Sequence, residues 1–298
     1  MRRQTVVAAV LASAVSAVAP AASVHAAPRA QVARIAVTTR TYGADAADTM
    51  TTYAPREAGR FPAVVFVHGG GWGRAQPNSY EQQFAATLAR TEHWVVAVIG
   101  YPTWVADERH VEPAAVRRAV RLVAARPDVA RGRLALWGES AGGQLALLTA
   151  YRGAKPHHSL VSAVVSISGP TDMRIEFGSL AQTALGAVTR FEGLSPSGAA
   201  KAGSTRYRTT SPVDLVQPDD PPTFQAISRH DPLVPPVQIR ELATSLHARG
   251  VPHQTLHVPG SDHSTPIETE RPPKSKSTVE ELAIRFLLRA FARRQVGA

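Results

Sequence analysis

The residues with the clearest chemical potential are Gly138-Glu139-Ser140-Ala141-Gly142, a Gly-x-Ser-x-Gly string. This string follows a short apolar run that ends at Trp137, and it opens a helical pattern. A serine at a sharp turn between a strand and a helix is exposed and strained, and the residues two positions away need minimal side chains. The start of a helix also directs partial positive charge toward a developing oxyanion. The pattern therefore predicts Ser140 as a nucleophile in acyl transfer, with an ordinary glycine-rich turn as the alternative.

Acyl transfer also needs N–H donors for the oxyanion, and His68-Gly69-Gly70-Gly71-Trp72 is suited to supply them. Three consecutive glycines let backbone N–H groups converge where no side chain obstructs them. We expect the N–H groups of Gly70, Gly71 and Ala141 to form an oxyanion hole, and His68 to hold the loop. A phosphate-binding loop is disfavoured because no Lys-Ser or Lys-Thr pair follows the glycines.

A serine nucleophile needs a histidine that takes its proton and an acid that orients the histidine. His263 follows the last predicted strand, so it can reach over the edge of the sheet. Asp231 follows the preceding strand and is the expected acid. We therefore predict a triad of Ser140, His263 and Asp231.

Other residues compete for the roles of acid and base. Asp172 also follows a strand and is the main alternative acid, whereas Asp262 is adjacent to the expected base and poorly placed to orient it. His253 and His257 lie in or beside a strand, and His157-His158 belong to a polar loop. The loop pair is more typical of solvated side chains than of a metal site, and we expect neither a metal nor an organic cofactor.

Signals for substrate specificity are sparse. Trp72 and Trp104 are candidates for the wall of an acyl or alcohol pocket, because aromatic residues often line small-molecule sites. Packing in the core explains both tryptophans equally well. The sequence does not decide between these roles.

Short β-rich runs alternate with helical patterns, which is typical of an α/β protein with a mostly parallel sheet. The predicted strands cover Ile35 to Tyr42, Thr49 to Tyr53, Ala63 to Val67, Trp94 to Ile99, Leu134 to Trp137, Leu160 to Ser166, Thr223 to Ser228 and Gln254 to Val258. The first two are expected to form a hairpin at the sheet edge. Predicted helices begin at Asn78, near Pro113, and at Ser140, Pro236 and Ser277. Capping boxes are expected from Asn78 with Glu81 and from Ser277 with Glu280.

The alternation lapses between Met173 and Pro222, where Gly, Ser and Pro separate a few helical fragments. Long irregular insertions in compact domains are often functional lids. We therefore expect one catalytic domain over residues 27–298, with a small cap inserted at residues 173–222.

Residues 64–72, residues 134–148 and the C-terminal third resemble secreted esterases of the α/β-hydrolase superfamily. The likeness is to the branch with feruloyl and acetyl-xylan esterase-like enzymes, related to HGGG lipases and kynurenine formamidase-like enzymes. It covers roughly Arg40 to Phe291. It implies an α/β-hydrolase fold, a triad in the order Ser140, Asp231, His263, and no cofactor.

One departure from that pattern lies before the acid loop. Arg229-His230 stand where the family usually has a His-Gly pair, which affects the shape of the loop but leaves Asp231 in place. The loop also resembles that of prolyl-oligopeptidase-like peptidases, although no propeller precedes it.

The first 26 residues have the pattern of a secretory signal peptide. Arg2 and Arg3 precede an apolar stretch from Val6 to Val18, and Val24-His25-Ala26 is a small-residue cleavage site. We expect cleavage near Ala26, an extracytoplasmic protein and no stable membrane insertion. An uncleaved membrane anchor is the alternative, but the apolar run is short and is interrupted by Ser13, Ser16 and Pro20.

Composition excludes several classes of protein. The chain has 298 residues, no cysteine and a net charge of +10. Without cysteine it has no disulfide, thiolate metal site or thiol nucleophile. The 33 Lys and Arg residues are scattered, with no run of five, which favours a solvated surface over a nucleic-acid site.

Together these observations predict a secreted serine hydrolase that cleaves carboxylic esters of small molecules or carbohydrates. An amide or formamide hydrolase or a peptidase is the alternative, because the same triad serves both bonds. A catalytically silent binding protein of the cell surface is a third, but it requires the loss of a triad residue or of the glycine loop. The sequence does not indicate an oligomeric state.

Overall fold

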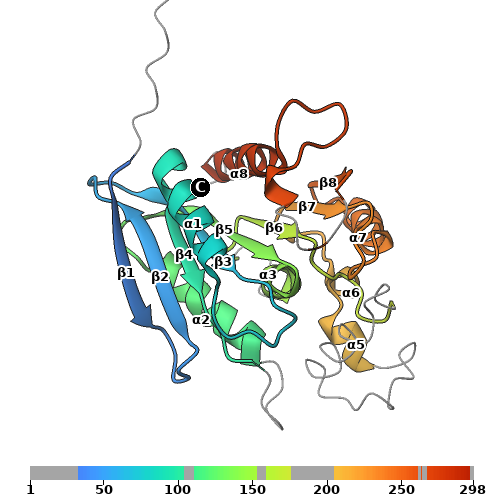
Figure 1. Cartoon of the computed structure of the whole chain (residues 1–298), viewed down its shortest axis with the longest axis horizontal. Coiled ribbons are helices and arrows are strands. Elements are labelled where there is room, and N and C mark those ends of the chain that lie inside the picture. Colours follow the sequence, from blue (N-terminus) through green and yellow to red (C-terminus); the bar gives the residue numbers. More distant parts are fainter. Residues whose placement is uncertain are drawn as a thin grey trace, which may run out of the picture. The chain divides into compact units, whose positions relative to one another are not determined.

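The computed structural model describes residues 33–103, 111–152, 159–175, 205–260, 263 and 267–295. The strands of this part form one eight-stranded sheet with the order β1-β2-β4-β3-β5-β6-β7-β8 (Figure 1). The β2 strand is antiparallel to both of its neighbours, and all other pairs are parallel. The prediction of an α/β-hydrolase fold with a mostly parallel sheet is confirmed.

The bounds of the strands follow the apolar runs of the sequence. The strands are β1 (Ile35–Thr41), β2 (Thr49–Pro55), β3 (Phe61–Val67), β4 (Val95–Ile99), β5 (Val129–Glu139), β6 (Ala163–Ile167), β7 (Thr223–Ser228) and β8 (His253–Val258). Every residue of β4, β6 and β7 is buried, as expected for parallel strands covered on both faces.

Helices cover both faces of the sheet (Figure 1). The helices are α1 (Ser79–Glu92), α2 (Val111–Ala124), α3 (Ala141–Arg152), α5 (Thr205–Thr210), α6 (Pro212–Leu215), α7 (Val237–Ala248), α8 (Val279–Gln295) and the short 3-10 helix η3 (Ile267–Thr269). Phe84 and Leu88 of α1 share one buried apolar cluster with Leu287 of α8. The α2, α3 and α7 helices contribute to a second cluster on the other face. These two cores attach the helical layers to the two faces of the sheet.

Most predicted boundaries agree with the structure, and three differ. The strand predicted from Leu134 to Trp137 is longer, because β5 runs from Val129 to Glu139. The β1–β2 hairpin at the sheet edge is confirmed, as is the capping box of Asn78 and Glu81. The predicted strand from Leu160 begins only at Ala163, because Leu160 is 48% exposed and Ser159 forms a turn with Val161. In the last helix, Thr278 and Glu281 form the reciprocal bonds expected of Ser277 and Glu280. The helix begins at Val279, so its third residue is Glu281.

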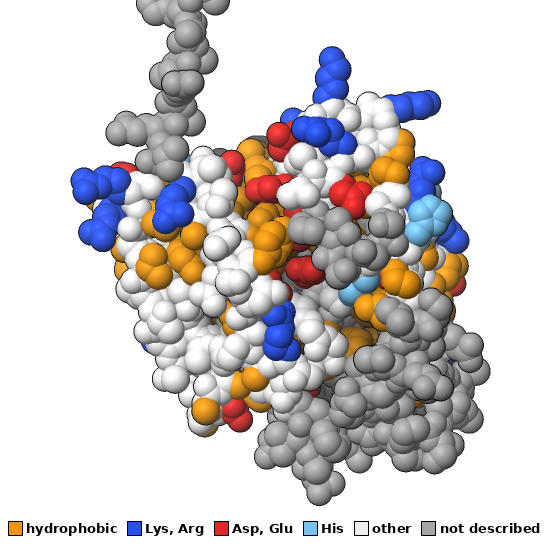
Figure 2. Space-filling model, viewed as in Figure 1, with side chains coloured by type: hydrophobic (Ala, Val, Ile, Leu, Met, Phe, Trp, Pro, Cys, Tyr) orange, Lys and Arg blue, Asp and Glu red, His pale blue; other side chains and the backbone are white. Residues whose placement is uncertain are grey.

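The structure describes only the two ends of the predicted cap, and residues 176–204 lie outside the described part. The predicted signal peptide also lies outside it. In the described ranges, no helix combines the length and apolar character needed to cross a membrane. Basic side chains on the face shown in Figure 2 stand at separate places rather than in one patch.

Candidate active site

Ser140 lies at the sharp turn between β5 and α3. Its φ of 52° is in the left-handed region, which residues with a Cβ atom rarely adopt. Its N–H donates to the Ile167 carbonyl at 2.8 Å, which ties the turn to β6. A Cβ on Gly138 would overlap the Gly142 carbonyl, and one on Gly142 would overlap the Val67 carbonyl. Both glycines are therefore required by close backbone approach, as the motif predicts.

His263 and Asp231 lie in direct contact with this turn. The Nε2 atom of His263 is 2.7 Å from the Ser140 hydroxyl oxygen, and its Nδ1 atom is 2.8 Å from Asp231 Oδ2. A carboxylate only accepts, so Nδ1–H is the donor and Nε2 is free to accept the serine proton. The structure thus brings the three predicted residues into one hydrogen-bonded line.

The acid is itself held firmly. Its side chain is fully buried, and Oδ1 accepts hydrogen bonds from the N–H groups of Leu233 and Val234, both at 2.9 Å. Asp231 follows β7, while His263 follows β8 and Ser140 follows β5. All three therefore meet at the carboxyl edge of the parallel strands, where open α/β sheets place their sites.

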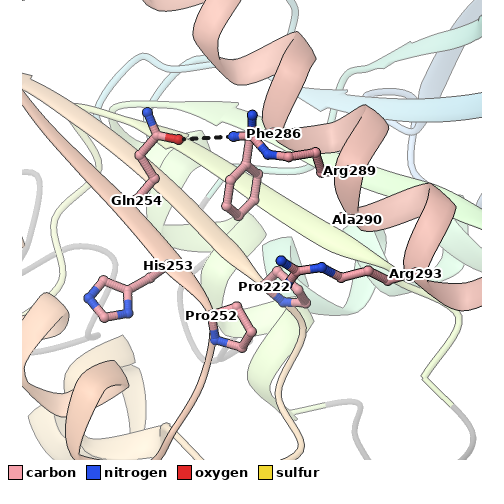
Figure 3. Close-up of a pocket in the computed structure, with 8 residues that line it drawn as sticks. All are labelled: Pro222, Pro252, His253, Gln254, Phe286, Arg289, Ala290 and Arg293. Carbon is pink, nitrogen blue, oxygen red and sulfur yellow. Dashed lines mark hydrogen bonds between the residues drawn. The ribbon is translucent and has the colours of Figure 1, made fainter.

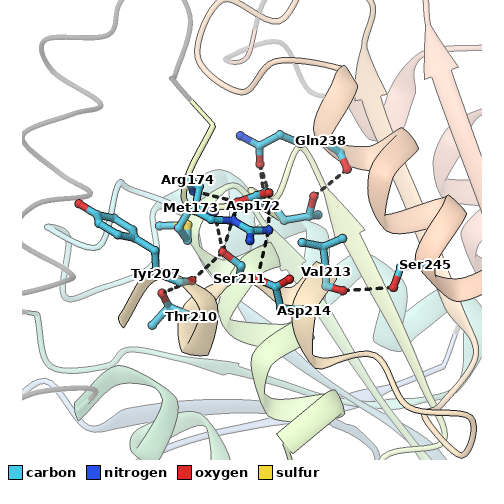
Figure 4. A network of polar contacts seen from close by, with 11 residues as sticks. Asp172, Met173, Arg174, Tyr207, Thr210, Ser211, Val213, Asp214, Gln238 and Ser245 are labelled. Carbon is cyan, nitrogen blue, oxygen red and sulfur yellow. Dashed lines mark hydrogen bonds and ion pairs between the residues drawn. The ribbon is translucent and has the colours of Figure 1, made fainter. Parts of the chain in front are cut away.

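The alternative acid, Asp172, serves a different purpose. Its carboxylate accepts hydrogen bonds from Arg174 Nε at 2.9 Å and Nη2 at 2.8 Å (Figure 4). Arg174 also pairs with Asp214 of α6, and Gln238 of α7 accepts from the Asp172 N–H. This network joins the two described ends of the segment predicted to be a cap to each other and to α7. Asp172 is therefore engaged in holding these segment ends together.

Of the alternative histidines, the two that the structure describes, His253 and His257, have no hydrogen bond to Ser140. His253 begins β8 at the opposite end of the strand, and its Nδ1 atom is 3.0 Å from the Val251 carbonyl. His257 lies within β8. Asp262 and the His157-His158 pair lie outside the described residues.

The glycine loop follows β3 and lies against the serine turn. The N–H groups of Gly70 and Gly71 have no hydrogen-bond partner among the described residues. Gly70 and Gly71 have φ values of 120° and 59°, which only glycine adopts readily. As the first residue of α3, Ala141 has an N–H without a partner inside its helix. These three donors are thus available for an oxyanion.

His68 lies beneath this loop and is not placed to act as a base. Its ring stacks on Tyr101 with centroids 4.2 Å apart, and its Nδ1 atom is 2.6 Å from the Gly69 carbonyl. The Tyr101 hydroxyl donates to the His68 carbonyl at 2.8 Å. Burial lowers the pKa of His68 to about 4, so the ring is neutral at physiological pH.

The surroundings of Trp72 favour one of its two expected roles. The side chain is only 4% exposed, and its indole N–H donates to Gln144 of α3 at 3.0 Å. The Gln144 amide in turn donates to the Thr210 carbonyl at 2.9 Å. This burial favours the packing role over a pocket wall, because little of the ring remains for a substrate to contact. Trp104 lies outside the described residues.

Two acids with raised pKa values lie near the serine turn, the half-buried Glu139 that precedes Ser140 and the buried Glu268 of η3. Burial, and then the charge of Glu81, raises the pKa of Glu139. Burial, and then the charge of Glu139, raises the pKa of Glu268 to about 8, so Glu268 is largely protonated at neutral pH. Sequence reasoning did not single out Glu139 or Glu268, since no spacing pattern links a motif residue to a short 3-10 helix.

A separate pocket of about 170 Å³ lies between α8 and the starts of β7 and β8 (Figure 3). Pro222, Pro252 and Phe286 line it, and Arg289 donates to Gln254 across it at 3.3 Å. Pro222, Pro252 and Gln254 stand at the amino ends of β7 and β8, whereas the triad residues follow the carboxyl ends of their strands. The pocket therefore does not belong to the triad.

The sheet order and the groups gathered at its carboxyl edge define an α/β-hydrolase. The chain belongs to the BD-FAE family, an α/β-hydrolase-type family of esterases, whose family model matches residues 50–246. The match includes Ser140 and Asp231 and ends before His263. The chain is accordingly a carboxylic-ester hydrolase by family.

Solved structures share the fold at low sequence identity. A truncated carbohydrate esterase from gut microbiota has a TM-score of 0.69 and 17% identity, over 88% of this chain and 98% of that one. An esterase from Pyrobaculum calidifontis has a TM-score of 0.63 and 23% identity, over 78% of each chain. An acetyl ester-xyloside bifunctional hydrolase from Caldicellulosiruptor lactoaceticus has a TM-score of 0.61 and 19% identity, over 84% and 88%. The comparison with curated proteins found no match.

Proposed function

We propose that this protein is a secreted esterase that works by a Ser-His-Asp acyl-enzyme mechanism. The observation that carries the proposal is the line of contacts from Asp231 through His263 to Ser140, at 2.8 and 2.7 Å. This geometry provides a nucleophile, a base within reach of its proton, and an acid that fixes the base.

In the first step the Ser140 oxygen attacks the ester carbonyl carbon. His263 Nε2 takes the hydroxyl proton, and the carbonyl oxygen becomes an oxyanion facing the N–H groups of Gly70, Gly71 and Ala141. When the bond to the leaving oxygen breaks, the imidazolium returns the proton to that oxygen and the alcohol departs. The Asp231 carboxylate stabilises the imidazolium between these transfers.

In the second step water attacks the acyl group on Ser140. His263 Nε2 takes a proton from the water, and the same N–H groups face the second oxyanion. The bond between the acyl carbon and the serine oxygen then breaks, the serine regains its proton, and the acid is released. The chain's own residues therefore supply every proton transfer, and the proposed mechanism uses no cofactor.

We propose small acyl esters, including esters attached to carbohydrates, as the substrate class. The support is the family assignment and the names of two structural neighbours, one a carbohydrate esterase and one an acetyl ester-xyloside hydrolase. A nucleic-acid partner is not part of the proposal.

Hydrolysis of a p-nitrophenyl ester series from acetate to palmitate tests this function. We expect rapid turnover of short esters, release of acetate from acetylated xylan, and loss of nearly all turnover in a folded Ser140→Ala variant. An anilide and N-formylkynurenine serve as the amide arm of the assay. Full activity of folded Ser140→Ala would refute the mechanism, and faster amide than ester cleavage would move the protein to the amide hydrolases.

Export is proposed on the leader pattern of residues 1–26. Expression with the natural leader should release a protein whose first residue is Ala27, as N-terminal sequencing of the culture medium will show. An intact leader on a membrane-bound product would establish the uncleaved anchor instead.

A further inference from the structure

The peptide unit between Gly69 and Gly70 is held from its carbonyl side. The Gly69 carbonyl oxygen is 2.6 Å from His68 Nδ1, and it also accepts hydrogen bonds from Arg74 Nε at 3.2 Å and Arg74 Nη2 at 3.0 Å. The N–H of Gly70 belongs to the same planar unit, and in a trans peptide the C=O and N–H point in opposite directions. Fixing the Gly69 carbonyl therefore also fixes the direction of the Gly70 N–H.

Glu81 holds Arg74 in place and also contacts the loop itself. The Glu81 side chain is 2% exposed, and its Oε1 atom is 2.6 Å from Arg74 Nη2. The same oxygen accepts the Gly69 N–H at 3.3 Å, while Oε2 accepts the Asn78 N–H at 2.6 Å. The start of α1 is thus connected to both ends of the Gly69 residue.

The loop lies so close to the serine turn that a small rotation of this peptide would matter. A Cβ on Gly69 would lie 3.0 Å from the Glu139 carbonyl oxygen and 3.2 Å from Ser140 Cβ. A Cβ on Gly70 would meet Arg74, so the arginine packs directly over the donor peptide. Oxyanion donors act only within a narrow range of distances from the developing charge.

We propose that Arg74 and Glu81 are positioning residues, which orient the Gly70 N–H toward the oxyanion formed at Ser140. The inference rests on the proposed function, because the oxyanion arises in that mechanism. Neither side chain exchanges a proton or contacts the reacting atoms. They act by holding the Gly69 carbonyl together with His68, so their effect belongs to the transition state and not to substrate binding.

The alternative is that the pair only stabilises the start of α1. Asn78→Ala separates the two roles, because it removes the side-chain acceptor of the Glu81 N–H. The backbone N–H of residue 78 and every carboxylate contact of Glu81 with the loop remain. This variant weakens the helix start without touching the donor peptide.

The experiment compares wild type with Arg74→Met, Glu81→Gln, the double variant of both, and Asn78→Ala. Each folded protein is assayed with p-nitrophenyl acetate and with a short-chain alkyl trifluoromethyl ketone, which forms a tetrahedral adduct on an active serine. For both single variants we expect kcat to fall roughly 10- to 100-fold, part of the effect of losing a whole oxyanion donor. KM should change less than about threefold, and the inhibition constant of the ketone should rise by the same factor as kcat falls.

The double variant distinguishes loop positioning from charge burial. Glu81 is buried, so removing Arg74 leaves a buried charge without its partner, which destabilises the protein by itself. Removing both charges should raise the melting temperature above that of either single variant, while kcat remains low. Recovery of kcat together with stability would overturn the proposal.

The remaining outcomes distinguish a failure of this inference from a failure of the proposed function. Asn78→Ala should melt earlier and keep kcat within about twofold of wild type, and a loss as large as that of Arg74→Met would contradict the assigned role. The Arg74 side chain is one-third exposed, so Arg74→Met should fold. If the wild type is active and Arg74→Met is equally active, the inference alone is overturned. A wild type that cleaves no ester overturns the proposed function and this inference with it.

Discussion

His263 Nε2 lies 2.7 Å from the Ser140 hydroxyl oxygen although the two residues are 123 positions apart in the chain. Ser140 follows β5 and His263 follows β8, which are separated in the sheet by β6 and β7. The contact therefore brings together residues that follow two strands that are not neighbours in the sheet. Asp231, which follows β7, supports the histidine from beneath at 2.8 Å.

Asp231→Asn should lower kcat by about 10⁴-fold, the effect of the same change in serine proteases with this triad. An amide beside Nδ1 favours the wrong tautomer of His263 and leaves the imidazolium without a counter-charge. Steady-state hydrolysis of p-nitrophenyl acetate measures the loss, and circular dichroism verifies the fold.

Asp172→Asn is the matched control, because Asp172 is the competing acid at the sheet edge. It should destabilise the protein by about 1–3 kcal/mol through its lost bonds with Arg174. Its kcat should stay within roughly tenfold of wild type. The reverse ranking of the two variants would reassign the acid to Asp172.

Gly142→Ala should destabilise the protein by at least about 3 kcal/mol and abolish turnover. The added methyl group would overlap the Val67 carbonyl and push α3 away from the serine turn. Gly73→Ala provides the comparison, since its nearest atom would lie 3.8 Å away and the change should alter stability by less than about 1 kcal/mol. Thermal unfolding of both variants is the measurement, and equal melting temperatures would refute the packing argument.

Trp72→Phe should reduce stability more than catalysis. It leaves Gln144 Oε1 without the indole N–H, which costs about 1–3 kcal/mol for a buried polar group. KM for short esters should change less than roughly threefold, because the side chain is buried in the core. A large rise in KM for one acyl length without loss of stability would restore the role of pocket wall.

Glu112→Gln should stabilise the protein above neutral pH and have little effect near pH 4.5. Burial raises the pKa of Glu112 from 4.5 to about 7. Between these values the folded state keeps its proton while the unfolded state has lost it, so stability falls as pH rises through this window. Well above pH 7 the full cost of burying the ionised Glu112 is reached, at about 3 kcal/mol of folding stability.

Urea unfolding of wild type and Glu112→Gln at pH 5 and pH 8 measures this difference. Glu57→Gln is the control for the substitution itself, because it makes the same change at an exposed position. A gain that is the same at both pH values would assign the effect to side-chain packing instead of ionisation.

Local patterns in the sequence were sufficient to predict most of the fold. Buried parallel strands read as continuous apolar runs, and Asn78 with Glu81 marked the start of α1, because both features depend on neighbouring residues alone. The same holds for the serine turn, since its glycines are required by backbone approach within a few residues. The start of the last helix was placed one residue early, because Ser277 and Thr278 are both suitable caps and each has a glutamate three positions later.

Contacts between distant segments were decided only by the tertiary structure. Asp231 and Asp172 each follow a strand, and only the folded chain shows that Arg174 engages one while His263 contacts the other. Trp72 could equally have lined a pocket until the packing of α3 placed Gln144 beside its indole. The contacts of Arg74 and Glu81 with Gly69 likewise follow from the position of α1 against the glycine loop. Sequence spacing carries the periodicity of a helix or strand, whereas the meeting of two segments depends on how all the elements pack together.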